Sequence, residues 1–314
     1  MKQVLLASPR GYCAGVERAV DTVERALQLY GKPVYVRKQI VHNSHVVREL
    51  EELGAIFVDS VDEIPEGSTV VFSAHGVAPA VRVAADARQL TSIDATCPLV
   101  TKVHTQARRY AEAGYTIVLI GHPGHEEVEG TLGEAPDATV LVESVADANA
   151  LELPAETRLA YITQTTLSVD ETHVIIAALR RRFPQIEGPA REDICYATSN
   201  RQWAVKELLD RVGLLLVVGS HNSSNSVRLV EVSSAAGVPA YLVDDASEID
   251  EAWLDGVDVV GVTSGASVPE RLVRDVCEWF RAHGVADIGE YRSVFEDVAF
   301  KLPVELRRAE RSAA

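Results

Sequence analysis

The chain has 314 residues, of which 47% are hydrophobic, and its 46 acidic and 30 basic side chains give a formal net charge of −16. This length suffices for two or three domains with buried cores. The acidic balance argues against nucleic acid or an anionic membrane surface as the main partner. The apolar run at the N-terminus is too short for a signal peptide and predicts a first strand. We therefore expect a cytoplasmic protein with reduced thiols.

Short runs of Val, Ile and Leu alternate with helical stretches rich in Ala, Arg and Glu, which is typical of α/β architecture with parallel sheets. The strands are expected at residues 3–7, 34–37, 70–73, 117–120, 159–162, 214–218 and 257–262, with shorter ones at 92–94, 139–142 and 240–243. The helices are expected at residues 16–30, 43–53, 100–113, 169–183, 200–212, 226–236 and 269–283. Several of them end at Gly or Pro, as helices commonly do.

Three of the four cysteines lie far apart, each in a short polar motif: Cys13, Cys97 and Cys195. A core cysteine is usually a small hydrophobe among apolar neighbours, but these three are flanked by Gly, Pro, Thr or Asp. Cys277 differs, because Leu272, Val276 and Phe280 recur around it at helical spacing and place it in a core. Three thiolates gathered from separate parts of the chain could hold one iron–sulfur cluster and leave one iron open to substrate.

The loops after the predicted strands carry most of the polar side chains that could bind a ligand: His42, His75, His125, Ser223, Ser224, Asn225 and Ser267. In open α/β sheets, ligands bind at the carboxyl ends of the strands, and helix N-termini favour phosphate. Together these loops predict a shared cavity for a small diphosphate. The alternative that the three histidines are zinc ligands stays open.

The leading acid/base candidate is Glu127, in a segment where carboxylates stand beside histidines at a strand end. Spacing alone does not rank it above Glu126 or Glu129. Thr165 and Thr166 follow another apolar strand. The next helix is expected to be capped near Ser168 or Asp170. One of the two threonines is also expected to cap it, and the other to hydrogen-bond substrate or Glu127.

Nine motifs, in order along the chain, resemble those of the 4-hydroxy-3-methylbut-2-enyl diphosphate reductase family: residues 11–20, 41–43, 74–76, 94–100, 121–131, 163–170, 193–202, 219–226 and 263–269. The resemblance extends to about residue 295. It implies three α/β lobes with small, mostly parallel sheets in a cloverleaf around a central 4Fe–4S cluster. The implied ligands are Cys13, Cys97 and Cys195, with the fourth iron open. The implied lobes are residues 14–96, residues 97–194, and residues 1–13 with 195–290, followed by a tail at 291–314.

The resemblance also implies an activity. The family removes the allylic hydroxyl of its substrate with two electrons and two protons, and yields isopentenyl and dimethylallyl diphosphates. This is the last step of the methylerythritol phosphate route to isoprenoids. By motif, the diphosphate would be bound by His42, His75, Ser223, Ser224, Asn225 and Ser267, with His125 and Thr166 close by. Glu127 would deliver protons, and Thr165 would orient the hydroxyl.

The implied electron donor is a reduced ferredoxin or flavodoxin. Such donors are acidic, so docking on this acidic chain needs a local basic patch. Residues 180–182 are the first candidate and residues 37–38 the second, although the three arginines at 180–182 also suit the C-terminal dipole of their helix. From the residues alone two other classes stay open: a phosphorylated-ligand binding protein without a cluster, and a zinc hydrolase.

Overall fold

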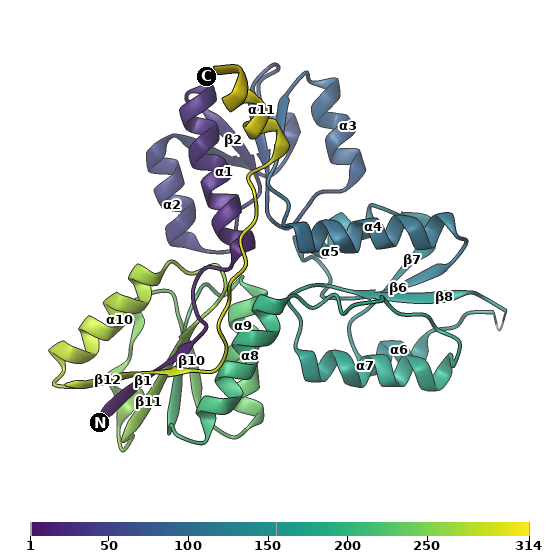
Figure 1. The fold of residues 1–314 in the computed structure, drawn as a ribbon. Coiled ribbons are helices and arrows are strands. Elements are labelled where there is room, and N and C mark those ends of the chain that lie inside the picture. The colour runs from purple at the N-terminus through teal and green to yellow at the C-terminus, as the bar shows by residue number, and fades with distance from the viewer. Residues whose placement is uncertain (1, 155, 314) are drawn as a thin grey trace. The chain divides into compact units, whose positions relative to one another are not determined.

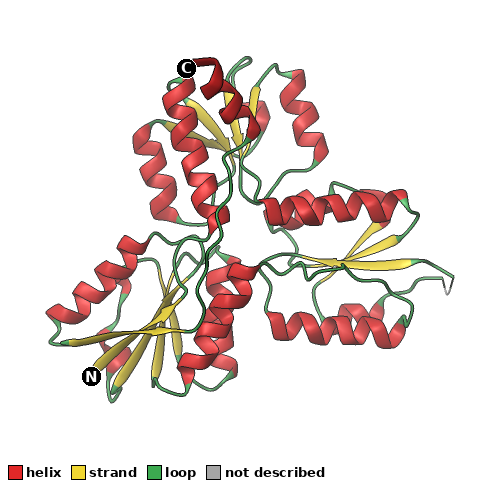
Figure 2. Ribbon diagram, viewed as in Figure 1, coloured by secondary structure: helices red, strands yellow, loops and turns green. Residues whose placement is uncertain are grey.

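The computed structural model describes residues 2–154 and 156–313. Its strands form three sheets in which every pairing between named strands is parallel, and helices flank each sheet (Figures 1 and 2). The predicted α/β class with small parallel sheets is therefore confirmed. The chain divides into two compact units. The first unit comprises Met1–Val16, His42–Val47 and Tyr196–Ala299, and the second comprises Glu17–Val41, Arg48–Cys195 and Phe300–Ala314.

The first unit is built on a five-stranded sheet in the order β10-β9-β11-β1-β12. The strands are β1 (Gln3–Ser8), β9 (Leu214–Val218), β10 (Ala240–Val243), β11 (Val259–Ser264) and β12 (Asp287–Arg292). Strand β1 pairs with both β11 and β12, so the first strand of the chain lies between two of the last. One face packs on α8 (Tyr196–Leu209) and α9 (Ser224–Ala235), and the other on α10 (Glu270–Ala282) (Figure 1).

The second unit contains a four-stranded sheet in the order β3-β2-β4-β5. The strands are β2 (Val34–Arg37), β3 (Ala55–Val58), β4 (Thr69–Phe72) and β5 (Thr91–Asp94). The accompanying helices are α1 (Ala14–Tyr30), α2 (Ser44–Leu53), α3 (Pro79–Ala87) and the C-terminal α11 (Val304–Ala313). Helix α11 is tied to α1 by an ion pair between Arg25 and Glu310, with 2.6 Å between Nε and Oε1, and its Leu306 is fully buried. The chain from Phe300 onward is thus part of this unit, whereas the first part of the predicted tail, up to Ala299, belongs to the first unit.

The second unit also contains a three-stranded sheet, in the order β7-β6-β8. The strands are β6 (Thr116–Ile120), β7 (Thr139–Val142) and β8 (Leu159–Thr163). Figure 1 shows the sheet between two pairs of helices: α4 (Pro98–Glu112) with α5 (Glu126–Leu132), and α6 (Val145–Ala150) with α7 (Val169–Arg182). Both faces of the sheet are therefore covered, which explains why β6 and β8 read as continuous apolar runs.

Every predicted strand and helix is present, and β2, β7, β9 and β10 have the predicted bounds. Six elements were not predicted: β3, β12, α3, α5, α6 and α11. They are short or carry many exposed polar side chains, so their periodic signal is weak. Cys277 is buried on α10 as predicted. The three-lobe boundaries expected from the sequence stay a prediction. Across the described residues, no helix has the length and apolar character needed to cross a membrane.

Candidate functional site

Glu127 lies in the first turn of α5 and is only 2% exposed. One carboxylate oxygen accepts a hydrogen bond from the backbone N–H of Thr165 at 2.6 Å, and the other accepts one from the Thr165 hydroxyl at 2.9 Å. Burial raises the pKa of Glu127, and the Thr165 hydrogen bonds and nearby histidines offset this only in part. A carboxyl group whose pKa is raised in this way is suited to donate a proton to a bound ligand.

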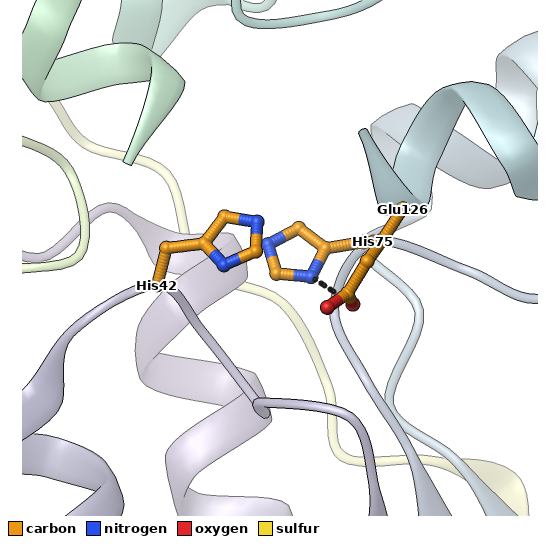
Figure 3. Close-up of side chains that lie close together, drawn as sticks. All are labelled: His42, His75 and Glu126. Carbon is orange, nitrogen blue, oxygen red and sulfur yellow. Dashed lines mark hydrogen bonds and ion pairs between the residues drawn. The ribbon is translucent and has the colours of Figure 1, made fainter. Parts of the chain in front are cut away.

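The two rival carboxylates on α5 have different surroundings. Glu126 lies next to His75, with 3.2 Å between Oε2 and the imidazole Nδ1, as Figure 3 shows. The same oxygen accepts a weaker hydrogen bond from Ser73 at 3.5 Å. Glu129 is exposed. Of the three candidates that the sequence left unranked, Glu127 alone is buried, and both of its carboxylate oxygens accept hydrogen bonds from Thr165.

His125 is the N-cap residue of α5, and its Nδ1 accepts a hydrogen bond from the backbone N–H of Glu127 at 3.1 Å. Burial, together with the neighbouring His75 and His122, lowers the pKa of His125 to about 3. The imidazole is therefore neutral at physiological pH. Since Nδ1 is the acceptor, the proton lies on Nε2, which makes that atom a donor for a ligand.

The prediction that Thr165 or Thr166 caps α7 is wrong. Ser168 is the N-cap, and its hydroxyl accepts a hydrogen bond from the N–H of Glu171 at 3.3 Å. The cap must be the residue just before the first helical one, and the threonines lie too early in the chain. Thr165 contacts Glu127 instead, and the hydroxyl of Thr166 accepts a hydrogen bond from Gln164 at 2.9 Å.

In the first unit, two predicted phosphate ligands from separate segments, Ser223 and Ser267, form a hydroxyl cluster together with Ser226. The Ser223 and Ser267 hydroxyl oxygens are 3.4 Å apart, and Ser226 donates to Ser223 at 3.0 Å. Ser267 also donates to the backbone carbonyl of His42 at 2.9 Å. The structure thus brings together the loop after β11, the start of α9 and the segment of His42.

Asn225 fixes the N-terminal turn of α9 to the loop after β11. Its side-chain oxygen accepts from the N–H of Ala266 at 2.8 Å, and its amide donates to Thr198 at 3.2 Å. The loop approaches α9 so closely that a Cβ atom at Gly265 would overlap the hydroxyl of Ser226. Ser224 begins the helix. Hydroxyls and helix N–H groups in this arrangement suit an oxyanion such as phosphate.

The three polar-motif cysteines are half-buried, and none of them forms a disulfide in the part of the chain that the structure describes. The backbone N–H of each donates to a loop that carries candidate site residues: Cys13 to Ala266 at 3.2 Å, Cys97 to Ala74 at 2.9 Å, and Cys195 to Thr165 at 3.0 Å. Ala266 and Ala74 directly precede Ser267 and His75. Partly accessible thiols on loops anchored in this way fit the ligands of an iron–sulfur cluster, for which thiolate is the usual donor.

The structure also shows three basic residues to which the sequence had assigned no role. Their side chains hold the backbone that leads into the cysteines: Arg18, Lys102 and Arg201. The sequence signal that could have identified these basic residues is their position relative to the cysteines. Each follows a cysteine by five or six residues, near the start of the helix that comes after it.

Comparison with known proteins finds similarity over nearly the whole chain. The family model described as LytB protein matches residues 4–281. A 4-hydroxy-3-methylbut-2-enyl diphosphate reductase of Acidothermus cellulolyticus is 62% identical over 308 residues, which cover 98% of this chain and 91% of the relative. One of Rhodococcus opacus is 58% identical over 309 residues, covering 98% and 92%.

Solved structures give the same result. The E-1-hydroxy-2-methyl-but-2-enyl-4-diphosphate reductase of Plasmodium falciparum matches with a TM-score of 0.96 and 39% identity, covering 99% of each chain. A second structure, of the (E)-4-hydroxy-3-methyl-but-2-enyl diphosphate reductase described as the terminal enzyme of the non-mevalonate pathway, matches with a TM-score of 0.64 and 31% identity. It covers 90% of this chain and 100% of that one. The chain therefore belongs to the LytB family.

Proposed function

We propose that the chain is an iron–sulfur reductase that converts 4-hydroxy-3-methylbut-2-enyl diphosphate to isopentenyl and dimethylallyl diphosphates, the last step of the methylerythritol phosphate route. Family membership supports this activity. The observation that carries it is the buried carboxyl of Glu127, held by Thr165 and with a raised pKa. Reductive loss of a hydroxyl group needs such a donor, because the departing oxygen leaves far more easily as water than as hydroxide.

In this proposal hydroxyl, amide and imidazole groups bind the diphosphate, and several of them lie at the N-terminus of α9. The ligands are His42, His75, Ser223, Ser224, Asn225 and Ser267. The serine hydroxyls hydrogen-bond to one another. Because hydroxyl groups rotate, the same groups can turn to donate to phosphate oxygens without moving the backbone.

The proton steps are assigned to the second unit. The Thr165 hydroxyl orients the substrate hydroxyl, and Glu127 protonates it as the carbon–oxygen bond breaks. His125, neutral and with its proton on Nε2, and Thr166 lie beside this pair and hold the substrate through hydrogen bonds. Thr165 already bonds to Glu127, so the acid and the group that orients the leaving hydroxyl are positioned together.

The proposed cofactor is one 4Fe–4S cluster with an open fourth iron, held by Cys13, Cys97 and Cys195. When bound, it would supply the electrons and a Lewis-acidic iron for the departing oxygen. A reduced ferredoxin or flavodoxin is the proposed electron donor. Of the basic patch at residues 180–182, Arg180 donates to the Tyr161 hydroxyl at 3.1 Å, and Arg182 donates to the Ala148 carbonyl at 2.7 Å. Arg181 is therefore the residue of this patch assigned to docking.

The test begins with purification under anaerobic conditions. The protein should be brown, contain iron and sulfide, and form both products from the substrate with dithionite-reduced viologen. The Glu127→Gln variant should keep the iron and lose turnover. A colourless protein with zinc or with no metal would contradict the cofactor. Unchanged turnover in Glu127→Gln would contradict the assignment of the acid.

A further inference from the structure

Three basic side chains each hold the backbone segment that leads into one of the polar-motif cysteines. They are Arg18 on α1, Lys102 on α4 and Arg201 on α8. Each follows a cysteine closely in sequence, but none holds the segment of the cysteine that it follows. Which basic side chain holds which cysteine segment is therefore set by the tertiary fold and not by closeness in sequence.

Arg18, on the helix after Cys13, holds the backbone segment that leads into Cys97, called here the approach to Cys97. Its Nη1 donates to the carbonyls of Ala95 at 2.9 Å and Thr96 at 3.1 Å, and its Nη2 reaches the carbonyl of Asp94 at 3.4 Å. These are the three residues just before Cys97. The remaining donor, Nε, bonds the carbonyl of Lys301 at 2.8 Å, so the C-terminal segment fixes the guanidinium from the other side.

Lys102, on the helix after Cys97, holds the approach to Cys195. Its ammonium donates to the carbonyls of Arg191 and Glu192, both at 2.8 Å. It also forms an ion pair with the buried carboxylate of Asp193 at 3.0 Å. The other oxygen of that carboxylate accepts from the backbone N–H of Thr163 at the end of β8. The segment is thus tied both to α4 and to the sheet.

Arg201, on the helix after Cys195, holds the approach to Cys13. Its Nη2 donates to the carbonyl of Gly11 at 2.6 Å, two residues before the cysteine. Its Nη1 pairs with Glu296 at 3.1 Å and donates to the carbonyl of Ala197 at 3.0 Å. Arg201 is fully buried. Burying the Arg201 guanidinium has an unfavourable desolvation energy, even with a carboxylate partner. Such a buried charge is consistent with a role in fixing the backbone that it contacts.

Taken in sequence, the contacts form a closed cycle. The helix after Cys13 supports Cys97, the helix after Cys97 supports Cys195, and the helix after Cys195 supports Cys13. We propose that Arg18, Lys102 and Arg201 are positioning residues for the cluster ligands, and that each makes one cysteine loop depend on the helix of another. The three cations also place positive charge beside loops that would carry an anionic thiolate-bound cluster. This inference rests on the proposed cluster.

The first test is amide hydrogen exchange of the iron-loaded protein, read by mass spectrometry. In Arg18→Gln, exchange should be faster by about tenfold or more at residues 95–97, because charge-assisted hydrogen bonds that hold this segment are lost. In Lys102→Met the faster exchange should appear at residues 193–195, and in Arg201→Lys at residues 11–13. Arg201→Lys keeps the buried charge, which guards against simple unfolding.

Two matched controls lie on the same helices. Arg25→Gln removes the ion pair between α1 and Glu310 and leaves the Cys97 approach untouched. Arg109→Met removes an exposed cation from α4. Neither should change exchange at the cysteine segments. Unchanged exchange in the three test variants would overturn the proposal, and so would equal acceleration at all three segments, because that pattern indicates general destabilisation.

The second test reads the metal centre without turnover. Arg18→Gln and Lys102→Met should release iron to a chelator several times faster than the parent, and their midpoint potential should shift downward, because a nearby positive charge favours the reduced cluster. The controls should match the parent. Parent-like iron release and potential in both test variants would refute a role at the cluster. If the purified protein holds no cluster at all, the proposed function fails, whereas hydrogen exchange still decides whether the pairing of cations and loops is real.

Discussion

The polar sites of the two units differ in the chemistry that they contain. In the first unit, Ser223, Ser267 and Asn225 form hydrogen bonds among hydroxyl, amide and backbone groups, with no carboxylate in the network. In the second unit, Glu127 is buried beside Thr165, and His125 caps the same helix. The first site has rotatable neutral donors that suit an anion, and the second has a titratable acid in a dry environment.

This difference shows how one reaction can be divided between two parts of a chain. Hydroxyl and amide groups bind phosphate without changing protonation state, so the contribution of Ser223, Ser267 and Asn225 to affinity should depend little on pH. A buried carboxyl acts as an acid only while it is protonated, so Glu127 should act on the chemical step. Changes to the serines and Asn225 should therefore raise KM, and changes to Glu127 should lower kcat.

Loss of a thiolate should have the largest effect, because it would remove a ligand of the proposed cluster. Cys13→Ser, Cys97→Ser and Cys195→Ser should each lose iron and essentially all turnover. Cys277→Ser is the control, since Cys277 is buried in the core of α10, and it should keep both. Iron content and product formation under anaerobic conditions measure the effect. Full activity in any of the first three variants would show that the ligand set is wrong.

The next largest effect is expected from Glu127→Gln, which keeps the shape of the side chain and removes the transferable proton. The value of kcat should fall by about 10²–10⁴-fold, with KM little changed. Glu129→Gln, an exposed change on the same helix, is the control. If the loss appeared mainly in KM, the second unit would be a binding site, and the division between the units would not hold.

Ser267→Ala tests the first unit. The variant loses a hydroxyl that donates to His42 and lies beside Ser223. The KM should rise by about tenfold, the effect of losing one hydrogen bond to a charged group, while kcat should stay near the parent value. Steady-state kinetics with a saturating artificial donor separate the two terms. A fall in kcat alone would place Ser267 in the chemical step.

The acid stability of the protein tests the environment of His125. Its pKa is lowered from 6.5 to about 3, chiefly by burial. Between these values the unfolded chain binds a proton that the folded chain does not, so the free energy of unfolding falls as the pH is lowered from 6.5 towards 3. His125→Asn keeps a capping acceptor and removes the titration. Denaturant titrations at several pH values should show a shallower slope in this variant.

His173→Asn is the control for this measurement, since His173 lies exposed on α7 with its side chain 56% accessible. It should leave the pH dependence unchanged. An identical slope in His125→Asn and the parent would mean that other groups dominate the acid transition.

The smallest effect is expected at the surface. Arg181→Glu should raise the KM for ferredoxin by up to about fivefold, as expected for one exposed charge contact, and the rise should diminish with added salt. Turnover with reduced viologen should not change. Equal loss with both donors would mean that the substitution damaged the fold or the site.

Much of the fold was predictable, because buried parallel strands leave long apolar runs. Strands such as β9 are buried at every residue and were predicted with their observed bounds. Strand β12 was missed because it has polar, exposed residues at the edge of its sheet, and α5 was missed because it is short and begins inside a glycine-rich polar loop. Local periodicity does not register elements of this kind.

The site was predictable by residue type and less so by contact. Polar loops after strands identified Glu127, Thr165 and Ser267, but spacing did not separate Glu127 from its neighbours on α5. Burial separates them, and burial depends on tertiary packing. The contact between Arg18 and the approach to Cys97 is equally inaccessible to sequence patterns, since it joins residues far apart in the chain.

The pairing of β1 with β11 and β12 has a consequence for synthesis on the ribosome. Strand β1 is made first, yet its two neighbours end at Ser264 and Arg292. The loop of Cys13, which follows β1 directly, therefore lacks its native sheet until most of the chain has emerged from the exit tunnel. Such non-local pairing is slow to form. We expect insertion of the proposed cluster to follow the synthesis of β11 and β12.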